Sequence, residues 1–235
     1  MATFVLVHGA WHGGWCWKRV RPLLEAKGHD VFTPTLTGVG ERSHLLTRET
    51  RLETHITDIV NVIRWEELSD VVLCGHSYGG MVISGVADRV PAQIRSLVYL
   101  DAFVPADGQS TLDFMPPERV QMFLDTARAQ GDGWRMPPIP AAIFKVREEN
   151  QAWVDRQCTP HPVACFEEKI RLTSARDRVA RRTFILATQY NPSAFQGIAE
   201  RLRQDPSWTV VAMPCGHDVM VDLPGELAHA LIAAA

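Results

Sequence analysis

The sequence holds few cysteines, and none of them lies in a paired motif. Its five cysteines, an odd number, include no C-x-x-C pair, and no compact group of histidines and cysteines has the spacing of metal ligands. A complete disulfide framework is therefore not expected, and neither is a zinc site of recognisable spacing. We predict that the chain binds no metal.

Long apolar runs and an excess of positive charge are also missing. No apolar run approaches the roughly 20 residues that span a bilayer. The first residues, MATFVLVHG, lack the charged region and the cleavage site of a signal peptide. The formal net charge of −3 offers no basic surface for nucleic acid. We therefore expect a cytoplasmic protein that binds neither nucleic acid nor membrane.

Short β-branched runs alternate with longer amphipathic runs along most of the 235 residues. This alternation predicts an α/β fold, a mainly parallel sheet with helices on both faces. The strands are expected at 3–9, 29–36, 70–75, 94–102, 182–188 and 208–214. The helices are expected at 15–28, 53–68, 78–90, 192–204 and 223–234.

Residues 105–181 break the alternation. They contain many prolines together with aromatic and methionine side chains, and they look helical only in pieces. A disordered loop is the alternative, but the aromatic content favours a folded unit. We predict a core at 1–104 and 182–235, with a helical cap or lid at 105–181 inserted after the strand that ends at Asp101.

A G-x-S-x-G motif, GHSYG at 75–79, lies between a predicted strand and a predicted helix. The motif alone is weak, since chance supplies it in roughly one in ten chains of this length. A nucleophilic serine of this kind needs a sharp strand-to-helix turn, and the flanking segments supply one. Ser77 is therefore the predicted nucleophile, with a buried turn serine as the alternative.

A glycine-rich loop, HGAWHGG at 8–14, follows the first predicted strand. Acyl transfer needs N–H donors for the oxyanion that develops on the substrate. The expected donors are the backbone N–H groups of Ala10 and of Tyr78, the residue after the nucleophile. A flexible turn is the alternative interpretation of this loop.

Four segments carry a resemblance to a known family: FVLVHGAWHGGWCW, LLEAKGHDV, LCGHSYGGMV and CGHDVMVDLP. They resemble α/β-hydrolases, most closely the small plant-type esterases and hydroxynitrile lyases, a group that includes methyl-salicylate esterases. The resemblance covers most of 2–104 and 182–235. It implies an α/β-hydrolase fold and a serine hydrolase.

His217 is the predicted general base. It lies in the loop after the last predicted strand, where open α/β sheets place their sites, and the similar family has its histidine here. Most other histidines have simpler interpretations. His55 is expected on a helix surface and His161 in a solvated loop, while His12 belongs to the glycine-rich loop.

The acid is where the chain departs from its relatives. In the plant-type esterases it follows the strand that corresponds to TFILATQY, and Tyr190 stands at that position here. Asp101 ends the strand after the nucleophile's helix, 24 residues beyond Ser77, and a charge there is costly unless it is paired. Some haloalkane dehalogenases and lipases resemble this arrangement. Asp101 is the predicted acid, with a turn-capping aspartate as the alternative; Asp218 and Asp177 are poorer candidates.

A triad of Ser77, His217 and Asp101 predicts a carboxylesterase-like hydrolase that works through an acyl-enzyme and needs no cofactor. Trp11 and Phe103 are expected to line the pocket, which suits a small to medium apolar ester. This small-molecule ester is the expected partner, and a homodimer is left open. A thioesterase or a cofactor-free C–C hydrolase would use the same triad. A non-catalytic small-molecule receptor is the alternative from a different class.

Overall fold

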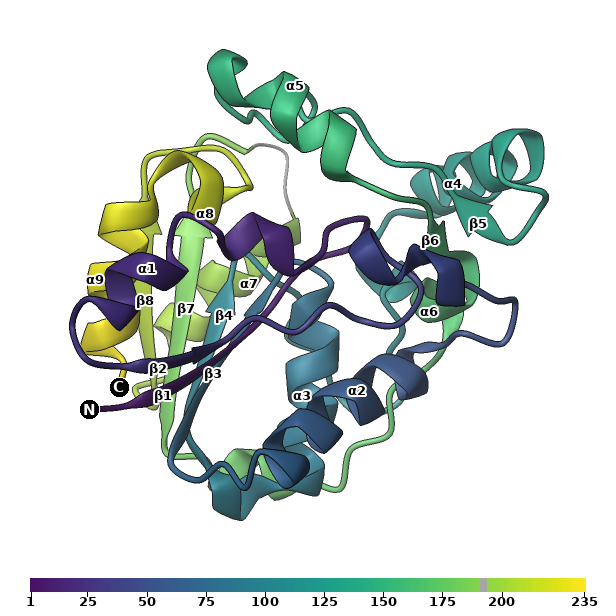
Figure 1. Ribbon diagram of the computed structural model, residues 1–235. Helices are drawn as coiled ribbons and strands as arrows, with labels where there is room; N and C mark the ends of the chain where they lie inside the picture. The colour runs from purple at the N-terminus through teal and green to yellow at the C-terminus, as the bar shows by residue number, and fades with distance from the viewer. Residues whose placement is uncertain (191–193) are drawn as a thin grey trace.

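The computed structural model describes residues 1–190 and 194–235. Its centre is a parallel six-stranded sheet in the order β2-β1-β3-β4-β7-β8 (Figure 1). The predicted α/β fold with a mainly parallel sheet is confirmed. The strands are β1 Thr3–Val7, β2 Asp30–Phe32, β3 Val71–His76, β4 Ile94–Leu100, β7 Arg181–Ala187 and β8 Trp208–Met213.

Helices cover both faces of this sheet. Helix α1 contacts α9 and helix α2 contacts α3, and the two pairs lie on opposite sides of the sheet (Figure 1). The helices are α1 Arg21–Glu25, α2 Leu52–Trp65, α3 Gly79–Arg89, α7 Ala194–Arg203, α8 Val219–Asp222 and α9 Pro224–Ala233. The first two positions of the helix expected at 192–204 lie outside the described residues.

The continuous helix expected at 15–28 is divided in two. A 3₁₀ turn, η1 Gly14–Trp17, precedes the short helix α1. Pro22 has no N–H, so a helix arriving from η1 could not hydrogen-bond through it, and the chain starts a new helix with proline in its first turn.

Residues 105–180 lie between β4 and β7 and add no strand to the central sheet, and Arg181 already belongs to β7. They form three helices and a small antiparallel pair of strands, and α4 and α5 stand beyond the carboxyl ends of the central strands (Figure 1). Their division from the core as a cap stays a prediction. The elements are α4 Pro117–Gln130, β5 Arg135–Met136, α5 Glu148–Gln157, β6 His161–Pro162 and α6 Val163–Glu167.

The carboxyl ends of the central strands bring the predicted site residues to one edge of the sheet. Ser77 follows β3, Asp101 follows β4, and His217 lies between β8 and α8. Strand β3 is buried along its whole length, so the turn that carries Ser77 follows directly from the core. Among the described helices, none is long and apolar enough to cross a bilayer.

Candidate active site

Ser77 occupies the sharp turn between β3 and α3. Its φ of +55° lies in the left-handed region that residues with a Cβ seldom adopt. The turn is held from both sides, because the Ser77 N–H donates to the Leu100 carbonyl at 3.1 Å and the Ser77 carbonyl accepts from the Phe103 N–H at 3.2 Å. This is the strand-turn-helix geometry of a nucleophile elbow.

Two glycines let other backbone segments approach the elbow. A Cβ on Gly9 would lie 2.8 Å from Nδ1 of His76 and 2.9 Å from the Cβ of Ser77. A Cβ on Gly80 would lie 2.1 Å from the carbonyl oxygen of Phe103. The loop after β1 and the segment after β4 therefore pack directly against the turn that carries the serine.

Asp101 and His217 form a hydrogen-bonded pair. Nδ1 of His217 donates to Oδ2 of Asp101 at 2.6 Å, and Oδ1 of Asp101 accepts the Ala187 N–H at 3.1 Å. Burial raises the pKa of the Asp101 carboxyl above its usual range, and the hydrogen bond from His217 opposes that rise. Because Nδ1 of His217 donates to the carboxylate, the lone pair lies on Nε2, which can accept a proton.

The loop that carries His217 packs on the 105–181 segment. The His217 N–H donates to the carbonyl of Phe144 at 2.9 Å. A Cβ on Gly216 would lie 2.1 Å from the carbonyl oxygen of Lys145, so a side chain at this position would push the two backbones apart. The position of the imidazole therefore depends on contacts with residues about 70 positions earlier in the sequence.

The backbone N–H groups of Ala10 and Tyr78 lack acceptors within the described part of the chain. Both residues are buried. Buried N–H groups without an acceptor are rare in proteins, and such groups suit the binding of an oxyanion. Trp11, the next residue, has a φ of +65° and donates through Nε1 to the Met136 carbonyl at 3.2 Å. The glycine-rich loop is therefore tied to the 105–181 segment.

The predictions for His55 and His161 were wrong, because both side chains are fully buried. Nε2 of His55 donates to the Thr37 carbonyl at 2.9 Å, and Nδ1 accepts the hydroxyl of Tyr78 at 3.0 Å. His55 lies four residues before Ile59, on the apolar face of α2. This spacing is the sequence signal for burial, and the hydrogen bonds at both ring nitrogens allow a histidine to occupy the buried face.

One group of candidate metal ligands occurs in the described residues: His55, His161 and Cys165, with ligand atoms within 4.8 Å of one another. The Cys165 thiol donates to the carbonyl of Thr50 at 3.6 Å, and Nδ1 of His161 accepts the Trp11 N–H at 3.4 Å. Both nitrogens of His55 also have partners, so hydrogen bonds hold this group behind Tyr78, except at Nε2 of His161, which is buried without a partner among the described residues.

A sequence model of the alpha/beta hydrolase family matches residues 4–230. The chain belongs to the alpha/beta hydrolase family.

This hydrolase is similar over nearly its whole length to the carbendazim hydrolyzing esterase of Nocardioides sp. (strain SG-4G). The two are 49% identical over 240 aligned residues that cover 99% of each chain. Salicylic acid-binding protein 2 of Nicotiana tabacum is 39% identical over 105 residues, 43% of this chain and 40% of that protein. An extracellular alpha/beta-hydrolase from Paenibacillus superposes with a TM-score of 0.85 at 24% identity, over 100% of this chain and 99% of that one. The predicted resemblance is confirmed, and the chain is a carboxylic ester hydrolase.

Aromatic rings surround His217 in this hydrolase. Phe195 stacks on the imidazole, with ring centroids 5.4 Å apart and planes 3° apart, and the ring of Phe144 lies 5.3 Å away. The ring of Tyr190 lies 4.8 Å away. The sequence reasoning missed Phe144 and Phe195, since neither lies in a recognisable motif.

The two predicted pocket residues lie next to different rings of this aromatic group. Phe103 is 4.9 Å from Phe195 between ring centroids, and Trp11 is 6.0 Å from Phe144. Their contact with a substrate stays a prediction. A cavity of about 850 Å³ lies elsewhere, between α2 and the segment around Ile170, and charged side chains line much of it.

Proposed function

We propose that this hydrolase cleaves esters through an acyl-enzyme, with Ser77 as nucleophile, His217 as general base and Asp101 as the acid of the triad. The hydrogen bond of 2.6 Å between Nδ1 of His217 and Asp101 carries the proposal. It selects the tautomer whose Nε2 can take the proton of Ser77. The left-handed turn at Ser77 supports the same assignment.

The reaction follows from these groups. His217 takes the hydroxyl proton of Ser77 while Oγ attacks the carbonyl carbon of the ester, and the N–H groups of Ala10 and Tyr78 donate to the oxyanion. His217 then gives the proton to the leaving alcohol as the C–O bond breaks. In the second half of the cycle His217 takes a proton from water while the water oxygen attacks the acyl carbon. His217 then gives this proton to Oγ of Ser77 as the bond between Oγ and the acyl carbon breaks.

We infer that the substrates are methyl esters and methyl carbamates attached to a flat aromatic group. The rings of Phe144, Tyr190 and Phe195 beside His217 favour such a group through stacking contacts. The full-length relative is named for carbendazim, a methyl carbamate of an aminobenzimidazole, which supports the same class. The 105–181 segment, joined to the loop of His217 through Phe144, would act as the cap that shapes the pocket.

The test uses the purified full chain with carbendazim and with p-nitrophenyl acetate and butyrate as reference esters. We expect turnover of both classes and its loss in Ser77→Ala, together with covalent labelling of Ser77 by a fluorophosphonate in the wild type. Folded Ser77→Ala protein that still hydrolyses the esters would refute the assignment of the nucleophile.

The alternatives predict other results in the same experiment. A receptor would bind an aromatic ester equally well with and without the Ser77 hydroxyl and would turn none over. A thioesterase would prefer acyl thioesters to oxygen esters by orders of magnitude in kcat/KM. Either result would overturn the proposed substrate class.

A further inference from the structure

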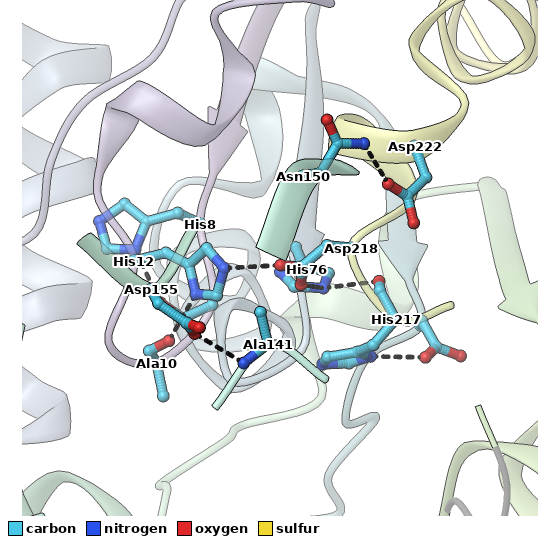
Figure 2. Close-up of polar contacts among 12 residues, drawn as sticks. His8, Ala10, His12, His76, Ala141, Asn150, Asp155, His217, Asp218 and Asp222 are labelled. Carbon is cyan, nitrogen blue, oxygen red and sulfur yellow. Dashed lines mark hydrogen bonds and ion pairs between the residues drawn. The ribbon is translucent and has the colours of Figure 1, made fainter. Parts of the chain in front are cut away.

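His12 and Asp218 form a buried ion pair that the proposed reaction does not use directly. Nε2 of His12 donates to Oδ2 of Asp218 at 3.0 Å, and Nδ1 of His12 donates to the carbonyl of Ala10 at 2.8 Å (Figure 2). His12 is 2% exposed and Asp218 is fully buried. The pair joins the glycine-rich loop to the residue that follows His217.

The partners of His12 determine its charge. A carboxylate and a carbonyl oxygen can only accept, so both ring nitrogens of His12 must carry a proton, and the ring is a cation. His8, in the same loop, donates from Nδ1 to the Gly9 carbonyl but accepts the Leu36 N–H at Nε2, so it is neutral. Two buried histidines of one loop therefore hold different charges because their partners differ.

The surroundings of His12 agree with a cation. Its ring stacks on Trp15 with centroids 5.1 Å apart and planes 16° apart, a geometry that favours positive charge over the indole face. Burial by itself would lower the pKa of His12, but the charge and the hydrogen bond of Asp218 outweigh it and raise the pKa above its usual range.

Asp218 is held as an anion by the same contact. Burial by itself would raise the pKa of Asp218, but His12 outweighs it and holds this pKa well below its usual range. Oδ1 of Asp218 lies 3.8 Å from Nε2 of His76, which donates to the His217 carbonyl at 3.1 Å (Figure 2). Asp218 and its neighbour His76 therefore lie against the backbone of the catalytic loop.

We propose that His12 and Asp218 are positioning residues that hold the oxyanion loop and the loop of the base in register, and that the positive charge of His12 balances Asp218 beside His217. The inference rests on the proposed function, since it assigns its effect to the oxyanion donor Ala10 and to the base His217. The hydrogen bond to the Ala10 carbonyl orients the peptide next to the oxyanion donor. The contact with Asp218 joins that peptide to His217.

The charge balance gives a pH signature. The titratable groups that interact with His12 are Asp218, His8 from its own loop, His76 from the elbow and His161 from the 105–181 segment. Burial lowers the pKa of each of these other three histidines, so Asp218 carries the charge that opposes His12. Removing the His12 charge while keeping a donor to Asp218, as glutamine does, leaves the Asp218 carboxylate without its cation in the residue next to His217.

The test compares His12→Gln, His12→Asn and Asp218→Asn by steady-state kinetics from pH 5 to pH 9 on p-nitrophenyl butyrate. Glutamine matches the Nε2 position and keeps the contact with Asp218, whereas asparagine matches Nδ1 and keeps the contact with Ala10. For His12→Gln we expect kcat to fall by roughly 100-fold, the effect of a small misplacement of catalytic groups. Its KM should stay within about twofold of the wild type.

The pH profile separates positioning from simple support of the fold. In His12→Gln the acidic limb of kcat/KM should move to higher pH by about one pH unit, because a neutralising charge is lost. In Asp218→Asn the limb should stay in place, because His12 loses its proton with its partner, while kcat still falls. His12→Asn should retain more kcat than His12→Gln, since it keeps the Ala10 contact.

Asp222→Asn is the matched control. Asp222 is buried four residues after Asp218, but it accepts from the Arg147 N–H at 3.0 Å and from Asn150 at 2.8 Å, both in the 105–181 segment. This variant should lower Tm and leave the pH profile unchanged. If the His12 and Asp218 variants behave like this control, with only Tm reduced, the proposal is wrong.

Two further results keep the test decisive. If His12→Gln does not fold, Asp218→Asn decides alone: wild-type kcat in this isosteric variant overturns the proposal, and a fall of kcat with an unmoved acidic limb supports it. Ser77→Ala is measured in parallel. Activity that survives in Ser77→Ala refutes the proposed function, whereas activity lost there but kept in the His12 variants refutes only this inference.

Discussion

Replacement of Asp101 by asparagine tests the least expected part of the site. Oδ1 of Asp101 accepts the Ala187 N–H at 3.1 Å, so the asparagine carbonyl should keep that place and direct its NH₂ group at His217. Nδ1 of His217 would then have to accept a hydrogen bond, and the proton would move to Nε2. An imidazole protonated at Nε2 cannot take the proton of Ser77, although the shape of the site is unchanged.

The size of the effect can be estimated from the pair itself. Two opposite charges about 4 Å apart interact by about 4 kcal/mol at an effective dielectric constant near 20. At about 1.4 kcal/mol for each factor of ten, loss of this stabilisation of the imidazolium lowers kcat about 1,000-fold. The wrong tautomer adds to this, and a loss near 10⁴-fold is typical of the same change in serine-protease triads.

The assay is kcat on p-nitrophenyl butyrate at pH 8, with Tm as the check of folding. Asp177→Asn is the control, since Asp177 is a half-exposed carboxylate and one of the two poorer candidates for the acid. Asp101→Asn should lose three to four orders of magnitude in kcat and the control none. Adding Tyr190→Asp to Asp101→Asn should recover part of the loss, because residue 190 lies beside the imidazole. A folded Asp101→Asn variant with kcat within tenfold of wild type would refute the assignment.

Two further predictions concern stability. Gly80→Ala would set a Cβ 2.1 Å from the carbonyl oxygen of Phe103, and it should lower the free energy of unfolding in urea by roughly 3 kcal/mol; an unchanged midpoint would contradict this packing. Because the folded-state pKa of His12 is raised, its stabilising contribution is complete below the unfolded value of about 6.5 and is lost as the pH rises through the folded value. Because the folded-state pKa of Asp218 is lowered, its contribution is present above about 3.9 and is lost as the pH falls through the folded value. In urea unfolding, the pair should therefore add most to the free energy of unfolding between about pH 4 and 6.5. In Asp218→Asn, the free energy of unfolding should fall less steeply as the pH rises above that range.

Local patterns were enough to predict most of the central fold. The apolar runs matched the six strands of the central sheet, and the GHSYG motif marked a true strand-to-helix turn at Ser77. Such signals depend on neighbours within a few residues, which the sequence displays directly. The exception was the helix expected at 15–28, because Pro22 has no N–H to continue a helix and a new one begins at Arg21.

The environment of each histidine could not be predicted in the same way. The prediction of solvent exposure failed for His55 and His161, since the segments that cover them come from distant parts of the chain. Asp218 was set aside because it adjoins His217 in sequence. Its partner is His12, which is 206 residues away, and no local sequence pattern indicates that contact.

The sequence by itself determined the strands, the elbow of Ser77 and the loop of His217, because hydrophobic periodicity and turn chemistry are local properties. The tertiary structure decided which carboxylate meets which imidazole: Asp101 with His217 across 116 residues, and Asp218 with His12. A hydrogen bond of this kind exists only when separate strands bring its two ends within about 3 Å. Sheet order and loop packing set that distance, and with it the charge that each buried group carries.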